Sequence, residues 1–289
     1  MTTASGAVAD VATARPRPRP GRWLVGALLL VVTVQIGWFL THSPRLEWDV
    51  VGQYLFDPNV LAGLGMSLLL TVVGMTIGSL LGLALAAGQL AAFAPVRWAS
   101  TVYVGVFRGI PPLVQLIFWY NLAYLLPRLS VGVPFGPTFG SWDTNQAITP
   151  LTAAIIGLTL HEAAYMAEII RAGLLSVDRG QRDAARAMGF TDRQAFARVV
   201  LPQAMRFIIP PTGSQFISLL KGTSLVSVIA MSDLLHSVQV IYNVTYDIVP
   251  MLLVACAWYL AVVTILSIGQ QYLERRFGRG HAVAGRGPS

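Results

Sequence analysis

The residues of this sequence that could do chemistry are ionisable and hydroxyl side chains set inside long apolar runs. A charged group in such a run is costly unless it faces protein partners or water, so these groups mark pathways for solutes or ions. Glu162, Tyr165 and Glu168 recur every three residues along one run, which puts them near one face of a helix. We therefore predict a polar translocation path lined by six residues: Arg108, Glu162, Tyr165, Glu168, Lys221 and Thr223.

Several of these residues also have another interpretation. Arg108 could pair with a carboxylate that only holds two helices together. Lys221, the single lysine of the chain, could extend to the outer surface, whereas with the hydroxyls beside it the lysine would suit a ligand that carries a carboxylate. His161, Glu162 and Glu168 could form a proton relay, which would make the protein a proton-coupled secondary transporter. Lining a water-filled cavity requires fewer assumptions.

The composition is that of a membrane protein. Hydrophobic residues make up 55% of the 289 residues and charged residues 11%, against about 25% charged in a soluble domain. The net charge of +7 is not arranged as a basic stripe with interleaved aromatics, which argues against nucleic acid. One cysteine and four scattered histidines predict no metal site. Because a nucleophile elbow and a phosphate-binding loop are both missing, we expect neither enzymatic activity nor a cofactor on this chain.

Six apolar runs are each long enough to cross a hydrocarbon core of roughly 30 Å. They lie at residues 23–40, 61–88, 98–126, 148–170, 207–234 and 250–271. We therefore predict an all-α membrane protein with six transmembrane helices. Residues 1–22, with proline at alternate positions in ARPRPRPGR, are predicted to form a disordered basic tail. A signal peptide is the competing interpretation of the first run, but the small-residue cleavage site is missing.

The distribution of lysine and arginine orients these spans. With the amino terminus inside, sixteen of the 20 cationic residues fall in inside segments, and the outside loops hold only Arg45 and Arg128. The positive-inside rule therefore predicts that both termini and the stretch 171–206 are cytoplasmic.

Proline and glycine predict a bend in the third span. Gly109, Pro111 and Pro112 follow Arg108 directly, so the helix should bend or break there and free backbone groups. Arg108 lies eleven residues after Arg97. A straight helix would therefore place it roughly 16 Å deep in the membrane.

Other glycines and prolines predict packing and loops. Gly74, Gly78 and Gly82 recur every four residues, which favours close contact with another helix. The proline pair at 210–211 predicts a second break, in the fifth span. The outside loop 127–149 is rich in glycine, proline and aromatic residues. A lid, a docking surface for an external partner and an irregular connector all remain open for it.

A charged stretch after the fourth span is predicted to hold a short helix over 178–189. Asp178 is expected to cap its amino-terminal end, with Gln181 at the third helical position. Gly189 suits the left-handed conformation that ends a helix.

A second helix should follow at once. Thr191 is expected to cap it, again with a glutamine, Gln194, three residues on, and Leu201–Pro202 is expected to end it. Two short helices joined at a glycine corner would make a rigid knob that a partner protein can grip. The alternative is an amphipathic hairpin that lies on lipid.

The segment DAARAMGFTDRQAFARVVLPQA resembles the coupling loop of the permeases of ABC importers, whose pattern is Glu-Ala-Ala, then Gly, then a hydrophobic residue with Leu-Pro. The segments VFRGIPPLVQL, AYMAEIIRAGLLSVDRGQ, LLKGTSLVSVI and YLERRF resemble the polar amino-acid branch of that family, which takes up histidine, glutamine, glutamate and arginine. Together they cover about residues 60–277 in the expected order. The residues that match the coupling pattern are Asp183, Ala184, Ala185, Gly189, Leu201 and Pro202.

The resemblance implies a type I importer core of five helices at 61–274, an added amino-terminal helix at 23–42 and a cytoplasmic tail at 275–289, in the inner membrane of a bacterium. It implies a second permease subunit, identical or homologous, and an external substrate-binding protein. Two ATPase subunits would bind ATP and Mg²⁺ and grip the 178–202 loop. The sequence departs from the family pattern at three positions. Asp183 replaces the usual Glu, Asp178 stands where Pro is common, and Gly222 stands where Asp is common.

Overall fold

The computed structural model describes residues 20–133 and 137–277, and the chain divides into two compact units, 1–47 and 48–289. The first unit holds helix α1 (Pro20–His42) and a short 3₁₀ helix, Pro44–Leu46. The segment Leu24–His42 of α1 is apolar and long enough to cross a membrane, as predicted for the first run. Most of the predicted basic tail, and residues 278–289 of the predicted cytoplasmic tail, lie outside the described residues.

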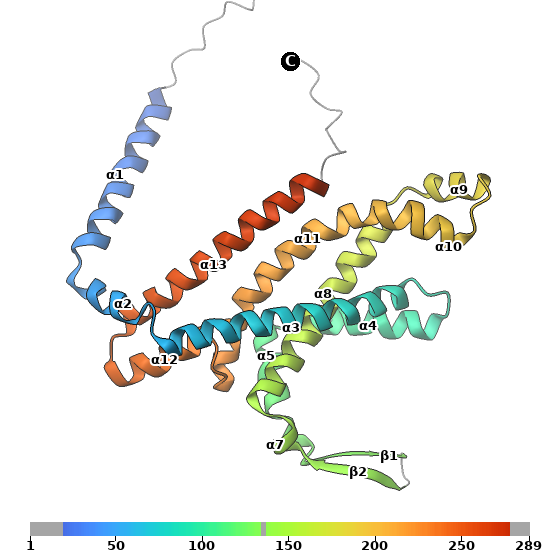
Figure 1. Cartoon of the computed structure of the whole chain (residues 1–289), viewed down its shortest axis with the longest axis horizontal. Coiled ribbons are helices and arrows are strands. Elements are labelled where there is room, and N and C mark those ends of the chain that lie inside the picture. The colour runs from blue at the N-terminus through green and yellow to red at the C-terminus, as the bar shows by residue number, and fades with distance from the viewer. Residues whose placement is uncertain (1–19, 134–136, 278–289) are drawn as a thin grey trace, which may run out of the picture. The chain divides into compact units, whose positions relative to one another are not determined.

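The second unit is a bundle of long helices (Figure 1). Across both units, the described part of the chain has four helices able to cross a membrane and two sharply bent helix pairs, which makes six spans if each pair counts as one. The predicted all-α membrane fold is therefore confirmed. The helices of the second unit are α2 (Trp48–Tyr54), α3 (Pro58–Gln89), α4 (Ala94–Gly109), α5 (Pro112–Tyr120), α6 (Leu122–Leu125), α7 (Thr144–Ala147), α8 (Pro150–Leu175), α9 (Arg179–Ala187), α10 (Asp192–Ala195), α11 (Leu201–Gly222), α12 (Leu234–Thr245) and α13 (Ile248–Phe277).

Helices α3 and α8 form the central crossing of the bundle, and the glycine stripe makes their close approach possible. A β-carbon on Gly78 would lie 2.8 Å from Glu162 Cβ, and one on Gly82 would lie 2.7 Å from Met166 Cβ. Gly74 faces Leu219 of α11 and Leu158 of α8. The predicted packing role of these glycines is confirmed. At Gly78 and Gly82 only a residue without a side chain fits, whereas at Gly74 a β-carbon would make ordinary contacts.

The predicted third span is not one straight helix. Helices α4 and α5 meet at an angle of 101° across Gly109–Pro112, which confirms the predicted break. Together the two helices are long and apolar enough to count as one broken span, in which Pro111 and Pro112 cannot continue the hydrogen bonds of α4.

Two expected helix ends are not observed on the way into the fifth span. Leu201–Pro202 does not end a helix, because a π-helical turn at Phe196–Val200 precedes it and α11 continues. Leu201 N donates to Phe196 O, five residues back. We attribute the tolerance of Pro202, which has no N–H, to this wider turn.

The pair Pro210 and Pro211 lies inside α11 without a break. The φ angle of proline is already helical, and neighbouring groups can replace lost backbone bonds in a membrane helix. The Thr212 hydroxyl also donates to Ile208 O at 2.8 Å, within the turn that follows the proline pair. The span then tightens into a 3₁₀ helix, η4 (Thr223–Ile229), and bends by 44° into α12.

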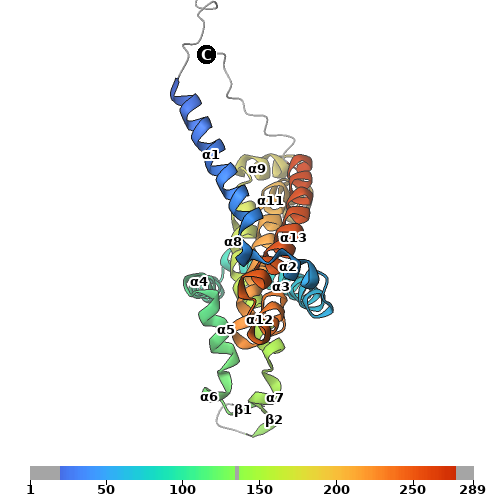
Figure 2. The same cartoon turned by 90° about the vertical axis from the view of Figure 1, so that its left-hand side faces the viewer.

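The loop 127–149 contains a small antiparallel hairpin, β1 (Arg128–Gly132) and β2 (Thr138–Asp143), in which Arg128 lies opposite Asp143 in the strand register. Asp143 Oδ1 accepts from Asn145 N at 2.8 Å and so caps α7. Figure 2 shows this hairpin at one end of the unit and α9 at the other. The 26 residues of α8 separate them, a helix length of about 39 Å.

Candidate functional site

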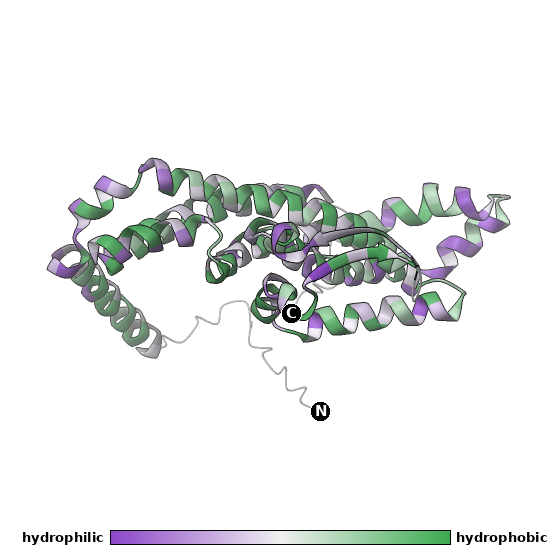
Figure 3. Cartoon of the chain, turned by 90° about the horizontal axis from the view of Figure 1, so that it is seen from below, coloured by the Kyte–Doolittle hydropathy of each residue, from purple (hydrophilic) through white to green (hydrophobic). Residues whose placement is uncertain are grey.

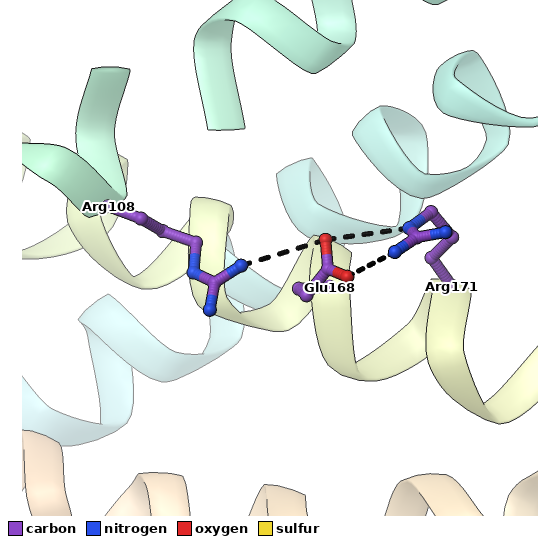
Figure 4. Close-up of polar contacts among 3 residues, drawn as sticks. All are labelled: Arg108, Glu168 and Arg171. Atoms are coloured by element: carbon purple, nitrogen blue, oxygen red, sulfur yellow. Dashed lines mark hydrogen bonds and ion pairs between the residues drawn. The ribbon is translucent and has the colours of Figure 1, made fainter. Parts of the chain in front are cut away.

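The candidate path residues Arg108 and Glu168 meet beside α8. Arg108 Nη1 lies 3.7 Å from Glu168 Oε2, and Arg171, one turn further along α8, binds the same carboxylate (Figure 4). The side chains of Arg108 and Glu168 are 42% and 28% exposed. Two cations around one half-exposed carboxylate leave a net positive, polar surface that can accept an anionic group.

Aromatic and amide groups complete this cluster. The Arg108 guanidinium carbon lies 5.3 Å from the centre of the Tyr165 ring, a cation–π distance. The Tyr165 ring in turn contacts the His161 ring, with centroids 4.9 Å apart. His161 Nδ1 lies 3.3 Å from Gln115 Nε2 on α5. We call Arg108, Tyr165, Glu168 and His161 the α8 polar cluster.

Glu162 is separated from this cluster. Its side chain is fully buried against Gly78, and its Oε2 accepts from Gln215 Nε2 of α11 at 3.1 Å. Its other oxygen, Oε1, has no partner among the described residues. The expectation that Glu162 shares one polar face with Tyr165 and Glu168 is wrong. A step of three residues turns a helix by about 300°, so positions 162 and 168 diverge, and positions 161, 165 and 168 form the stripe instead.

Lys221 and Thr223 lie further along the fifth span. Lys221 is exposed at the end of α11, whereas Thr223 is fully buried and its hydroxyl donates to Leu220 O at 2.8 Å. Within the described ranges, no hydrogen bond or ion pair joins either residue to the α8 polar cluster. Of the six predicted path residues, the structure therefore brings together Arg108, Tyr165 and Glu168.

Three polar groups of the site were not predicted from the sequence, and two of them, Gln115 and Asp233, are buried. Gln115 and Gln215 are the amide partners of the groups above, and their signal was an amide inside an apolar run. Asp233 is fully buried at the bend before α12, where its carboxylate accepts from Leu235 N, His236 N and the Tyr259 hydroxyl. It serves as the N-cap of α12.

The charged stretch 178–202 forms the predicted knob. Asp178 Oδ1 caps α9 through Gly180 N at 2.6 Å, but the reciprocal bond expected from Gln181 is absent, since the Gln181 oxygen accepts from Gln203 instead. Gly189 adopts φ +81°. Gly189 N donates to Arg186 O and Phe190 N to Ala185 O, the two bonds of a Schellman ending.

The second helix of the knob begins as predicted. Thr191 Oγ1 accepts from Gln194 N, and Thr191 N donates to Gln194 Oε1, which makes a capping box. Apolar residues buried between the helices hold the knob together, and they are Val177, Ala185, Ala195 and Val200.

The outer face of the knob is charged and exposed. Asp183 and Ala184 are exposed, and Met188 is 69% exposed between them and the glycine corner. Asp183 makes no ion pair with any described residue. Leu201 and Pro202 are also exposed, at the start of α11. Figure 3 shows hydrophilic residues gathered on this part of the unit, whereas the long helices are mainly hydrophobic.

The two alanines of the coupling pattern have different surroundings, which leads to a testable difference. Ala185 is 1% exposed, whereas Ala184 is exposed. Ala185→Leu should overpack the knob at a cost of about 1–3 kcal/mol, while Ala184→Leu should leave its fold intact. Limited proteolysis of the purified protein should therefore cleave the Ala185→Leu knob faster. Equal cleavage of both variants would contradict the assignment.

The fold and the site define a multi-pass membrane subunit with a polar cluster on its central helix and a rigid knob outside the spans, and comparison with known proteins gives its family. Residues 74–279 match the family model of the binding-protein-dependent transport system inner membrane component. The chain belongs to this family, the permease subunits of ABC transporters.

Individual relatives agree with this placement. The chain is 38% identical over 273 residues to the arginine transport system permease protein ArgU of Corynebacterium glutamicum, covering 92% of this chain and 83% of that one. It is 37% identical over 232 residues to the glutamate/aspartate import permease protein GltK of Escherichia coli, covering 80% and 98%. A crystal structure of an amino acid ABC transporter with histidines superposes with a TM-score of 0.67 at 34% identity, covering 79% of this chain and 98% of that chain.

Proposed function

We propose that this chain is the permease subunit of an ATP-driven importer that carries a polar amino acid across the inner membrane of a bacterium, with both termini in the cytoplasm. The observation that carries the proposal is that α8 bears most of a partly exposed charge cluster and leads directly into the exposed knob, which lies between α8 and α11. The names of the relatives, which include arginine and glutamate/aspartate permeases, support an amino acid as the solute.

The chemistry of the α8 polar cluster suits an amino acid. A free amino acid carries a carboxylate and an ammonium group, and the cluster offers a guanidinium at Arg108 and a carboxylate at Glu168. A substrate that exchanges into this ion pair replaces one charge-assisted contact by another, so its desolvation is offset. Lys221, Thr223 and Glu162 remain further candidates for the path.

The knob supplies the proposed coupling to ATP. ATP and Mg²⁺ would be bound by two separate ATPase subunits, each of which grips one knob through residues of the coupling pattern: Asp183, Ala184, Ala185, Gly189, Leu201 and Pro202. Asp183 is exposed without an ion pair in the described chain, so it is available to a partner. A second permease, identical or homologous, and an external substrate-binding protein would complete the assembly, which sits in the lipid bilayer.

The direct test is uptake of radiolabelled amino acids by cells that carry this chain with its neighbouring genes. We expect uptake of one or a few polar amino acids that disappears when the partner ATPase is inactivated. Uptake that survives the dead ATPase but collapses with the proton gradient would instead establish a proton-coupled secondary transporter. The structure disfavours that alternative, because Glu162 contacts α3 and α11 while His161 and Glu168 face α4 and α5.

The polar cluster can be tested by charge removal. Arg108→Gln and Glu168→Gln should each raise KM for uptake by about tenfold, the loss expected for one charge-assisted contact of about 1.4 kcal/mol. Uptake kinetics at equal membrane abundance measure the effect. Arg97→Gln is the matched control, because Arg97 lies at the far end of α4 and bonds to loop carbonyls of residues 91 and 92. Unchanged KM in both cluster variants would remove this cluster from the path.

A further inference from the structure

The bend between α4 and α5 leaves backbone carbonyls without their helical partners. In a continuous helix, Phe107 O and Arg108 O would accept from residues 111 and 112. Both of these are prolines and have no N–H to donate. In a membrane an unpaired carbonyl costs several kcal/mol, so the bend is stable only if other groups reach it.

From the first turn of α5, the side chain of Gln115 reaches Phe107 O and the carbonyl of Ile110, the residue that caps the end of α4. Gln115 Nε2 donates to Phe107 O at 2.9 Å and to Ile110 O at 2.8 Å, so one amide spans both sides of the bend. The residue is 5% exposed, so water does not compete for these bonds. Both hydrogens of the amide are thereby used, which fixes which end of the side chain faces the carbonyls.

Gln115 is also joined to the α8 polar cluster. Its Nε2 lies 3.3 Å from His161 Nδ1, a packing contact because both amide hydrogens already bind carbonyls. The His161 ring contacts the Tyr165 ring, and the Tyr165 ring lies beside Arg108. The contacts therefore close a ring, because Arg108 is the residue next to Phe107 in the chain. One part of this closed set of contacts is the backbone at the α4–α5 bend, and the other part is His161 and Tyr165 on α8.

We propose that Gln115 is a positioning residue, which holds the α4–α5 bend through two carbonyls and thereby fixes the Arg108 guanidinium against Tyr165 and Glu168. It acts through Arg108 and need not touch the solute. The functional part of this inference rests on the proposed transport path, whereas the geometric part does not.

The geometric part is tested by spin-label distances across the bend. Cys256→Ser removes the single cysteine, and labels are placed at Trp98→Cys on α4 and Ile117→Cys on α5, both exposed. The labelled protein is diluted with unlabelled copies so that only distances within one chain are read. With Gln115 present we expect one narrow distance distribution, which Gln115→Leu should broaden or shift. Gln115→Glu, which keeps the size and at most one donor, should give an intermediate distribution.

Val114→Leu is the matched control for this measurement, since Val114 is exposed on the same turn. It should leave the distribution unchanged. A Gln115→Leu distribution that matches that of the unsubstituted protein would overturn the proposal, whatever the uptake results.

The functional part is tested by a double-mutant cycle on uptake of radiolabelled L-arginine. Gln115→Leu alone should raise KM by about tenfold, and its effect should largely vanish in an Arg108→Lys background, because the two residues act as one unit. Additive effects would show that Gln115 does not act through Arg108. If Arg108→Lys leaves uptake unchanged, the proposed path fails instead, and the label distances still decide whether Gln115 holds the bend.

Discussion

Replacing Gly82 by leucine should lower the amount of folded protein in the membrane by at least about tenfold. A β-carbon at this position would lie 2.7 Å from Met166 Cβ, 2.9 Å from Ala167 N and 3.0 Å from Ala163 O. Two of these atoms belong to the backbone of α8, so they cannot move without shifting the whole helix. Overpacking of this kind costs about 1–3 kcal/mol or more.

The control for this prediction lies on the same helix. Gly65 also belongs to α3, but nothing lies within 4 Å of a β-carbon built there. Gly65→Leu should therefore give normal amounts of protein. Fluorescence-detected size-exclusion chromatography of detergent extracts measures both variants. Equal monodisperse peaks for the two would contradict the close helix crossing.

Replacing Gly189 by valine should abolish uptake while leaving the protein in the membrane. Gly189 has φ +81°, a conformation that costs about 1–2 kcal/mol for a residue with a β-carbon and more for a branched one. Nothing lies within 4 Å of a β-carbon built on Gly189, so the effect comes from the backbone conformation and not from a clash. The angle between α9 and α10 should change, and ATP hydrolysis by the partner should continue without transport.

Two further variants separate the backbone effect from loss of the knob. Asparagine tolerates the left-handed conformation, so Gly189→Asn should retain most of the uptake. Ala187→Val adds the same branched side chain on the exposed surface of α9 and should be nearly neutral. Uptake and ATPase rates are compared in reconstituted vesicles. Unchanged uptake in Gly189→Val would contradict the proposal that the knob couples ATP hydrolysis to transport.

Much of the fold could be predicted because local signals agree with tertiary structure. Apolar runs of sufficient length gave the membrane helices, and Gly109 with the proline pair placed the break beside Arg108. The caps at Asp178 and Thr191 and the left-handed Gly189 are set by bonds within a few residues, which are visible in the sequence. The spacing of Gly74, Gly78 and Gly82 predicted close contact with another helix, but it did not show that this helix is α8.

Other features depended on contacts that no local pattern contains. Proline was expected to end helices at 202 and 210. Instead a π-helical turn precedes Pro202, and α11 continues through Pro210 and Pro211. Glu162 was grouped with Tyr165 by a spacing of three, whereas its direction is set by Gly78 and Gln215 on other helices. The roles of the coupling and path residues remain predictions until uptake is measured.

The single polar contact between Glu162 and Gln215 joins the two helices that carry the knob. Glu162 stands 13 residues before the end of α8, and Gln215 stands 14 residues after the start of α11. The parts of α8 and α11 between this contact and the knob are thus nearly equal in length, roughly 20 Å each. A rotation of about 5° at this contact would move their ends at the knob by roughly 2 Å. If α8 and α11 rotate about this contact, a small displacement of the knob would reach the middle of the bundle as a rotation, at the level of the α8 polar cluster.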